Sequence, residues 1–548
     1  MNNTLINKYK TEAQNAQNKG NYAIAIDTYS KILAIDPTNH FSMNNLSIIY
    51  LNQSRLDLAE EILIRLMSCS EGDAASFNHL AIVYMRTYRL HQAKKLLEHA
   101  LSLDPFKIET FQNLTNVCAQ LKDNDLALHY ALEAIKIDPT SSATFNNLGS
   151  VFNAMAKFEE ARLAFETAIE LDNKNLEALV NLGTANVILH NVDEAIKIYE
   201  RGLKKLPKYA ATQSDVIKFL LSFEYLKVGR LKEGWEYYDS GFHPSIPLGN
   251  ARSPARTFKK PRWNGQQIKE KTLLVWREQG LGDEMMFLSL IPDLLKRVKN
   301  VVLEVDYRLV ETLQRSFPTI LVREQRYGIP PHFEALDHDY DYQVPLASLM
   351  RYFRPTIEHF KSSGPYLLVD PIKRLKYSDR LKQSEDKLRI GICWRSGNID
   401  PLRELTYVGI MKWDELFKLD NVEWVNLQYG ECEQECLEAE KAFGIKLKRW
   451  DDINLKDDLD DVFALMFELD YIVTVATAVH HMAASVGCET LLITPKGAWN
   501  RFNLKHDPWF PNLKPFVVDY QNLASALPMV RDYITTHGKP VVKSIVSL

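Results

Sequence analysis

The stretch WREQGLGDEMMF, residues 276–287, places two glycines and an aspartate between an apolar run and a helix-like segment. Gly280 and Gly282 let the backbone turn sharply and let a ligand approach it closely. Asp283 comes directly after the turn, so its carboxylate can serve as a general base that takes the proton of an attacking hydroxyl. The structural alternative makes Asp283 the N-cap of a helix over 284–296. A dinucleotide-binding fingerprint is excluded, because its third glycine is missing.

A second stretch, TVATAVHHMAASVG at 474–487, combines a helix start with a histidine. We expect Thr477 to cap a helix that runs to Gly487, and the free N–H groups at its start would bind an anion such as phosphate. His481 lies one turn into this helix, where it can bind phosphate or ribose or stabilise a departing charge. The alternative, a histidine with a purely structural role, stays open.

Polar side chains follow three further apolar runs. They are Arg395, Ser396 and Asn398 after the run 389–394, Gln428 after 422–427, and Lys496 and Arg501 after 490–494. A guanidinium such as that of Arg395 can give paired hydrogen bonds to a phosphate. Gln428 can read a base or a sugar, and Lys496 with Arg501 can hold a phosphate between them. A surface arginine at 395 and a solvated loop at 496–501 are the alternatives.

These residues need strands and helices to hold them. Short runs rich in β-branched residues predict strands at 272–276, 301–305, 319–322 and 340–344, and a second series at 389–394, 422–427, 445–450, 471–475, 490–494 and 516–519. Helical segments separate most of these runs, which predicts two parallel α/β layers in tandem. Two facing layers of this kind bind ligands in the cleft between them, at the carboxyl ends of their strands.

The first part of the chain is a repeat array. Prolines 37, 105, 139 and 207 are separated by multiples of 34 residues, and alanine recurs at strict 34-residue spacing at Ala25, Ala59, Ala93, Ala127, Ala161 and Ala195. This period and these residue types are those of the tetratricopeptide repeat (TPR), a pair of helices in which small residues such as Gly149 allow close packing. We count six repeats over 6–209 and an irregular seventh to about 241. The alternative is an array that is only a spacer.

One position of the repeat is almost always a carboxamide. It reads Asn45, His79, Asn113, Asn147 and Asn181. In a TPR array this position lies on the first helix of each pair and points into the concave groove. A carboxamide donates and accepts, so a ladder of asparagines could hold an extended peptide without reading its sequence. Hydrogen bonds between neighbouring helices are an equally good explanation.

Composition excludes several classes of function. The 548 residues hold 66 Lys plus Arg against 70 Asp plus Glu, so no electrostatic case exists for nucleic acid binding. We find no apolar run long enough for a membrane span and no signal peptide at the start of this chain. The six cysteines and the acidic run 451–461 lack metal-ligand spacing, so we expect no metal and reduced thiols in a cytoplasmic protein.

Taken in order, these motifs resemble a known family. A TPR array followed by PRWNG at 261–265 and by LLVWREQGLGDEMMF at 273–287 is similar to bacterial TPR-containing glycosyltransferases of the GT-B fold. Their catalytic half is akin to heptosyltransferases and to the O-linked N-acetylglucosamine transferases. GICWRSGN at 391–398, NLQYG at 426–430 and GAWNRFNLKHDPWFP at 497–511 extend the resemblance over most of the chain.

The resemblance implies an N-terminal TPR superhelix followed by two facing Rossmann-like lobes. The boundaries would be 1–241 for the TPR array, 242–271 for an ordered linker, 272–370 for an acceptor-side lobe, 371–388 for an inter-lobe linker and 389–548 for a nucleotide-sugar lobe with a terminal helix. It also implies metal-independent sugar transfer without a cofactor, with Asp283 as base and His481 at the donor. The implied partner is a protein acceptor on the concave face, and some relatives are thought to modify flagellins.

One residue departs from the family pattern. Ala476 stands where relatives have an aspartate five residues before the histidine that corresponds to His481, and an extra histidine, His480, precedes it. This departure keeps open a binding scaffold with a degenerate transferase fold. A transferase with a lipid or glycan acceptor, whose repeats serve only assembly, is the other alternative.

Overall fold

The computed structural model describes residues 2–69, 72–206, 211–242, 252, 256–325, 339–360, 364–382, 386–397 and 406–540. Contacts divide the chain into two compact units, Met1–Pro207 and Lys208–Leu548.

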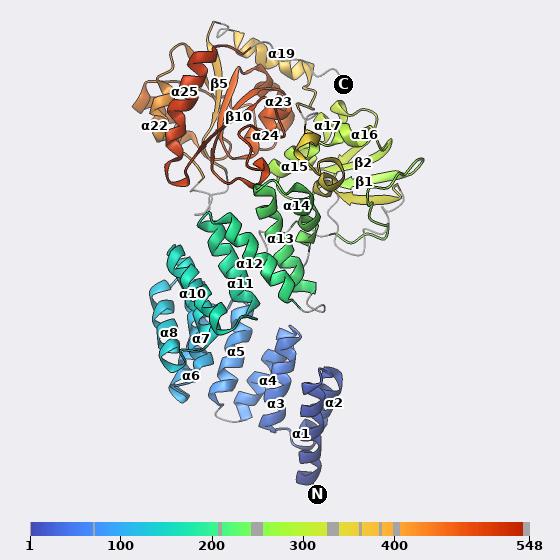
Figure 1. Cartoon of the computed structure of the whole chain (residues 1–548), viewed down its shortest axis with the longest axis vertical. Helices are drawn as coiled ribbons and strands as arrows, with labels where there is room; N and C mark the ends of the chain where they lie inside the picture. Colours follow the sequence, from blue (N-terminus) through green and yellow to red (C-terminus); the bar gives the residue numbers. More distant parts are fainter. Residues whose placement is uncertain are drawn as a thin grey trace. The chain divides into compact units, whose positions relative to one another are not determined.

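The first unit is a series of helix pairs (Figure 1). The helices are α1 (Asn2–Asn18), α2 (Tyr22–Ile35), α3 (His40–Asn52), α4 (Leu56–Cys69), α5 (Ala74–Arg86), α6 (Leu90–Leu103), α7 (Ile108–Gln120), α8 (Asn124–Ile137), α9 (Ser142–Ala154), α10 (Phe158–Leu171), α11 (Leu176–Ile188) and α12 (Val192–Lys205). The predicted repeat is therefore present as a helix pair every 34 residues.

Small residues let the helices of a pair approach closely. All six alanines of the 34-residue series are fully buried. A side chain added at Gly149 would place its Cβ 2.5 Å from the Phe165 ring, so only glycine fits there. The turn between the two helices of a pair also repeats, with a left-handed residue at Gly20, Ser54, Tyr88, Lys122, Ala156 and His190.

Residues that we expected to form a seventh repeat belong to the second unit. They form α13 (Ala211–Lys227), α14 (Leu231–Tyr238) and η1 (Asp239–Phe242). Their aromatic side chains pack on the α/β part, where the Trp235 ring lies 6.4 Å from Phe287 and 6.0 Å from Phe502. Trp263 of the expected linker is also fully buried and stacks on Phe353.

The first sheet is parallel and has four strands in the order β3-β2-β1-β4. The strands are β1 (Thr272–Trp276), β2 (Asn300–Val305), β3 (Leu321–Glu324) and β4 (Tyr342–Pro345), and the helices beside them include α15 (Leu281–Leu288), α16 (Ile291–Leu295), α17 (Val310–Ser316) and α18 (Met350–Phe353). The chain runs outward from β1 to β3 and returns on the other side at β4. The strand order therefore reverses beside β1.

The second sheet is parallel and has six strands in the order β10-β9-β8-β5-β6-β7. They are β5 (Leu388–Cys393), β6 (Val422–Asn426), β7 (Leu447–Lys448), β8 (Tyr471–Val475), β9 (Glu489–Pro495) and β10 (Leu513–Val518). Here the order reverses between β5 and β8. Such a reversal leaves a crevice at the carboxyl ends of the strands, where parallel sheets bind ligands.

Helices cover both faces of this second sheet (Figure 1). One face packs on α22 (Glu433–Phe443) and α25 (Ala526–His537), in a core that includes Ile392, Val473 and Ile493. The other face packs on α23 (Leu459–Glu468) and α24 (Ala478–Ser485), in a core shared with the first sheet. Helix α19 (Pro371–Arg380) lies between the two sheets in sequence. The predicted pair of tandem parallel layers is confirmed.

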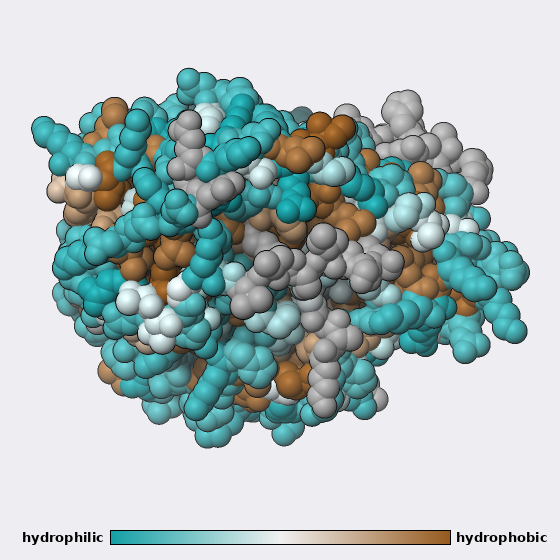
Figure 2. Space-filling model, turned by 90° about the horizontal axis from the view of Figure 1, so that it is seen from above, coloured by the Kyte–Doolittle hydropathy of each residue, from teal (hydrophilic) through white to brown (hydrophobic). Residues whose placement is uncertain are grey.

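The surface is mostly polar. On the face shown in Figure 2, hydrophilic residues predominate and the hydrophobic patches are small and separate. No described helix is both long and apolar enough to cross a membrane.

Candidate functional site

A cavity of about 530 Å³ lies between the two sheets of the second unit. The first lobe lines it with Gly280, Leu281, Gly282, Asp283 and Arg308. The second lobe contributes residues from the ends of β5, β6 and β8 and from the start of α24, namely Ser396, Leu427, Tyr429, Ala476, Thr477, His480 and His481, together with Lys456, Trp499 and Asn500. The cavity therefore meets both sheets at the points where their strand order reverses.

The glycine turn starts helix α15 rather than preceding it. Helix α15 begins at Leu281 with Gly280 as its N-cap residue, and Asp283 lies within its first turn. The interpretation of Asp283 as the N-cap of a helix over 284–296 is therefore wrong. Its carboxylate lies in the first turn, near the positive end of the helix.

The two glycines of this turn differ in their surroundings. A Cβ on Gly282 would lie 3.4 Å from the Cα of Ala478, so glycine allows the start of α15 to approach the start of α24. Around Gly280 nothing lies within 4 Å of such a Cβ. The left-handed residue of the turn is Gln279, with φ of 65°.

The carboxyl group next to Asp283 faces inward. Glu284 is fully buried and accepts a hydrogen bond from the backbone N–H of Asp306 across 2.9 Å, and its other oxygen lies 2.9 Å from Nε of Arg277. Burial raises the pKa of Glu284 to about 7. Of the two adjacent carboxylates, only Asp283 lines the cavity.

Thr477 caps helix α24, as the sequence predicted. Its hydroxyl accepts from the backbone N–H of Val479 across 3.3 Å, and the residue is buried. The N-terminal end of α24 lines the cavity. Ala476 is exposed at the same wall, so a methyl group and not a carboxylate faces the cavity at this position.

His481 connects the two lobes. Its Nδ1 lies 2.8 Å from the carbonyl oxygen of Gly282, and its side chain is 3% exposed. Burial lowers the pKa of His481 to about 4. The neighbouring His480 is also buried, and its ring centroid lies 3.9 Å from that of His481.

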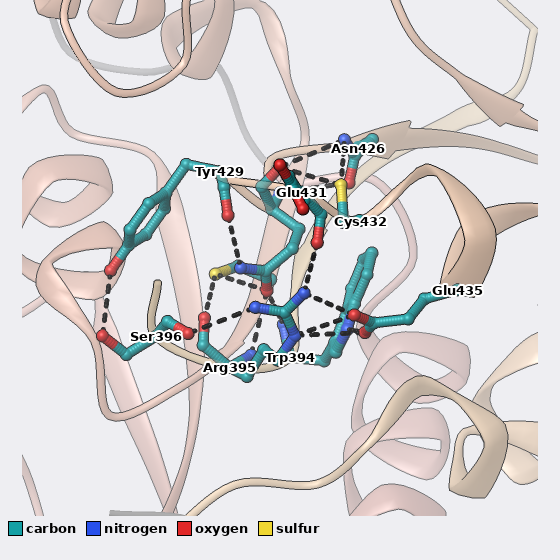
Figure 3. A network of polar contacts seen from close by, with 10 residues as sticks. Trp394, Arg395, Ser396, Asn426, Tyr429, Glu431, Cys432 and Glu435 are labelled. Atoms are coloured by element: carbon teal, nitrogen blue, oxygen red, sulfur yellow. Dashed lines mark hydrogen bonds and ion pairs between the residues drawn. The ribbon is translucent and has the colours of Figure 1, made fainter. Parts of the chain in front are cut away.

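Arg395 lies in a polar network beside this cavity (Figure 3). Its guanidinium forms an ion pair with Glu435, donating from Nε across 3.0 Å, and also donates to the carbonyl oxygen of Glu431 across 2.7 Å. Gln428 is fully buried, and its Oε1 accepts from the backbone N–H groups of Trp394 and Arg395. Both side chains thus hold the loop after β5 in place, and neither lines the cavity.

The other predicted donor-site residues are spread out. Ser396 lines the cavity, and its hydroxyl lies 3.3 Å from that of Tyr429. Lys496 is exposed and pairs with Asp519 at 2.8 Å, whereas Arg501 is buried and donates to the carbonyl oxygen of Leu504 across 2.7 Å. Burial lowers the pKa of Arg501. Asn398 lies outside the described residues.

The asparagine ladder of the first unit is largely bonded within the array. Asn113 donates to Oδ1 of Asn78 across 3.1 Å, and Asn181 donates to Oδ1 of Asn146 across 2.9 Å, each on the preceding helix pair. Asn45 donates to the carbonyl oxygen of Phe41 within its own helix. Asn147 is half-buried and makes no side-chain hydrogen bond to the residues that the structure describes.

The sequence did not reveal the residues that support the glycine turn through Glu278 and Gln279. The amide of Gln279 donates to the hydroxyl of Tyr238 across 3.1 Å, and the Tyr238 ring stacks on Trp499 with centroids 6.1 Å apart. Arg252 and Glu278 form a fully buried ion pair beside them. A seventh-repeat interpretation assigned Tyr238 to another domain, so no local signal linked it to the turn.

Two cations of the cavity wall were also missed. Arg308 pairs with Asp306 at 2.7 Å and donates to the carbonyl oxygen of Lys456 across 2.8 Å, which ties the first lobe to the second. The Lys456 ammonium is exposed and forms no ion pair with a described residue. Among the described residues no cluster of three His, Cys, Asp or Glu side chains could hold a metal ion.

Comparisons with known proteins agree with the repeat assignment. Models of the tetratricopeptide repeat match residues 28–61, 74–103 and 146–210. Protein FlbA of Caulobacter vibrioides is 30% identical over 317 residues, which cover 56% of this chain and 52% of FlbA. The chain thus spans about half the length of the curated relative that it matches.

Solved structures with similarity to this chain include several repeat proteins. The MamA protein is 21% identical, with a TM-score of 0.28, and the match covers 31% of this chain and 93% of MamA. PilF of Pseudomonas aeruginosa is 18% identical, with a TM-score of 0.33 and coverage of 39% and 96%. A tetratricopeptide repeat protein of Parabacteroides merdae is 12% identical, with a TM-score of 0.36 and coverage of 44% and 94%. The matches to the repeat models, and not these structures, show that the chain carries tetratricopeptide repeats in its N-terminal part, and FlbA is a relative of it.

Proposed function

We propose that this chain is a GT-B glycosyltransferase that moves a sugar from a nucleotide-sugar donor to a hydroxyl group of a protein acceptor, with a flagellin as the acceptor. The supporting observation is the cavity between two parallel sheets, which brings Asp283 and the N-terminal end of α24 to one space. A base and an anion-binding helix end facing each other are what metal-independent transfer from a nucleotide sugar requires.

In this proposal Asp283 takes the proton of the acceptor hydroxyl as the hydroxyl oxygen attacks the anomeric carbon of the sugar. The bond from that carbon to the nucleotide phosphate breaks, and the phosphate leaves with the electron pair. The amides at the start of α24, together with Lys456 and Arg308 at the cavity wall, would stabilise the negative charge.

The nucleoside end would lie in a second cavity of about 990 Å³ that shares Tyr429, Leu455 and Lys456 with the first. Its wall holds carboxylates, among them Glu431 and Asp452, that can accept hydrogen bonds from ribose hydroxyls but would repel phosphate. Gln428 lines this cavity, so its predicted contact with base or sugar would be made here. Arg395 would act on the donor through the loop that it holds, because its guanidinium is engaged by Glu435.

The repeats would hold the acceptor polypeptide. Asn113 and Asn181 each use one N–H on a neighbouring helix, and Asn147 has both groups of its carboxamide available to a peptide. Extended acceptor chains suit such a groove, because carboxamides bond to backbone groups that every peptide offers.

Donor-dependent release of nucleotide tests the proposal. The full chain is incubated with a panel of nucleotide sugars, with and without a flagellin, and free nucleotide and the intact mass of the flagellin are measured. Transfer predicts nucleotide release and a mass increase of one sugar unit or more. Binding of the flagellin without release from any donor would favour the degenerate scaffold, which the alanine at 476 motivates.

A further inference from the structure

His481 presents a ring nitrogen without a partner at the interlobe cavity. The residue lines the cavity and is 3% exposed, and its Nε2 atom is buried without a hydrogen bond to any described residue. The other ring nitrogen, Nδ1, lies 2.8 Å from the carbonyl oxygen of Gly282. One side of this ring is thus satisfied by the first lobe, and the nitrogen on the other side has no partner among the described residues.

The contact with Gly282 determines which nitrogen of His481 carries the hydrogen. A carbonyl oxygen only accepts, so Nδ1 must donate. Burial lowers the pKa of His481 to about 4, so the ring is neutral at pH 7 and carries a single N–H. Nε2 is therefore an acceptor with no hydrogen to offer.

We propose that Nε2 of His481 accepts a hydrogen bond from a hydroxyl group of the bound nucleotide sugar, on its ribose or on its sugar, and does not contact phosphate. An ionised phosphate oxygen is itself an acceptor, so it would face Nε2 lone pair to lone pair, whereas a hydroxyl donates. The identity of the ligand rests on the proposed function. The assignment of the hydrogen to Nδ1 rests on the Gly282 contact alone.

This assignment changes what the sequence allowed for His481. Phosphate binding and stabilisation of a departing negative charge both need a donor at Nε2, and the tautomer provides none. The His481 side chain is hydrogen-bonded to Gly282, and Gly282 directly precedes Asp283 in the glycine turn. His481 is therefore a specificity residue that joins ligand recognition to the position of this turn.

The tautomer is tested without ligand or turnover. The full chain is labelled with ¹⁵N in its histidine rings, and the signals of His481 are assigned from their loss in His481→Gln. We expect the neutral Nδ1–H form between about pH 6 and 8, because its pKa lies well below that range. A hydrogen on Nε2, or a charged ring at pH 7, overturns the inference.

Binding to defined probes tests the ligand contact. In His481→Asn the short amide can still donate to Gly282 but leaves no acceptor at the place of Nε2, whereas His481→Gln restores a carbonyl oxygen there. His537→Asn is the matched control, because Nδ1 of His537 also lies 2.8 Å from a backbone carbonyl, that of Tyr533, on the exposed end of α25. The probes are common nucleotide sugars, their nucleoside diphosphates and pyrophosphate, measured by calorimetry.

We expect His481→Asn to weaken binding of the best nucleotide sugar about threefold to tenfold, the effect of one lost hydrogen bond, with less loss in His481→Gln and none in the control. An equal loss for the nucleoside diphosphate assigns the hydroxyl to ribose, and a loss for the nucleotide sugar alone assigns it to the sugar. Unchanged affinity in His481→Asn, or an equal loss for pyrophosphate, overturns the hydroxyl contact. Absence of binding to the wild-type chain by every probe contradicts the proposed function as well.

Discussion

The side-chain amide of Gln279 donates a hydrogen bond to the hydroxyl of Tyr238 across 3.1 Å, which ties the turn before Asp283 to helix α14. The Tyr238 ring also stacks on Trp499, which lines the cavity from the second lobe. Tyr238 thus contacts both the glycine turn and the opposite wall of the cavity. Helix α14 is therefore part of the machinery that positions the proposed base.

Removal of the Tyr238 hydroxyl tests this positioning. Tyr238→Phe keeps the stacked ring and loses one neutral hydrogen bond, so we expect kcat to fall by roughly fivefold, with little change in KM for the donor. The matched control is Tyr237→Phe, because Tyr237 is the adjacent residue and packs on Tyr225 instead. Equal rates for the two variants would show that the turn does not depend on this bond.

The ion pairs at the start of α23 predict a specific loss of stability in acid. Burial alone would raise the pKa of Asp460, but hydrogen bonds from Arg315 and Thr312 outweigh it and hold the pKa below its usual value. The ion pairs with Lys373 lower the pKa of Asp461 in the same way against the effect of burial. Carboxyl groups with lowered folded pKa values stabilise the fold above their unfolded pKa of about 4, and this stability is lost as the pH falls through the folded values.

Asp460→Asn should therefore destabilise the second unit by about 2 kcal/mol or more at pH 7, since it breaks a buried pair with Arg315. The difference from wild type should shrink below about pH 4. All nine tryptophans lie in the second unit, so their fluorescence follows its unfolding by urea. The exposed Asp457 gives the control Asp457→Asn, and a difference from wild type that stays constant from pH 7 to about pH 3 would refute the linkage.

The repeated turn of the first unit carries backbone strain at one alanine. Ala156 has φ of 58°, a conformation that disfavours side chains with a Cβ, and the same position is glycine in the first repeat, at Gly20. Ala156→Gly should stabilise the array by about 0.5 kcal/mol. Glycine relieves the strain of the folded state, and this gain exceeds the loss that comes from the greater entropy of the unfolded chain. Ala154→Gly, at the end of the preceding helix, should destabilise the array. Unfolding followed by circular dichroism measures both changes, and destabilisation by Ala156→Gly or stabilisation by Ala154→Gly would contradict this account.

Asn147 offers the cleanest test of acceptor binding by the repeats. Asn113 and Asn181 bond to neighbouring helices, so their replacement by alanine should lower the unfolding temperature. Asn147→Ala removes no such bond and should reduce capture of the acceptor severalfold at an unchanged unfolding temperature. Normal capture by Asn147→Ala, with destabilisation in the other two variants, would leave the asparagines a structural role and favour a lipid or glycan acceptor.

Local patterns predicted the elements well and the contacts poorly. The 34-residue period predicted the helix pairs because each repeat buries the same small residues, such as Ala161. The β-branched runs predicted both parallel sheets, and Thr477 was identified as a cap because capping depends on neighbours in sequence. The partners of Arg395 and Gln428 could not be predicted, since Glu435 and the Trp394 backbone meet them only through the fold.

The central claim is that Asp283 is the general base of a sugar transfer. Asp283→Asn keeps the size of the side chain and removes its basicity, so turnover of the donor in the presence of acceptor should fall about 100-fold or more, the usual effect of losing general-base catalysis. Donor affinity should stay unchanged, and the exposed first-turn carboxylate of α21 (Asp414–Phe417) gives the control Asp414→Asn, which should turn over normally. Transfer by Asp283→Asn at the wild-type rate would contradict the account.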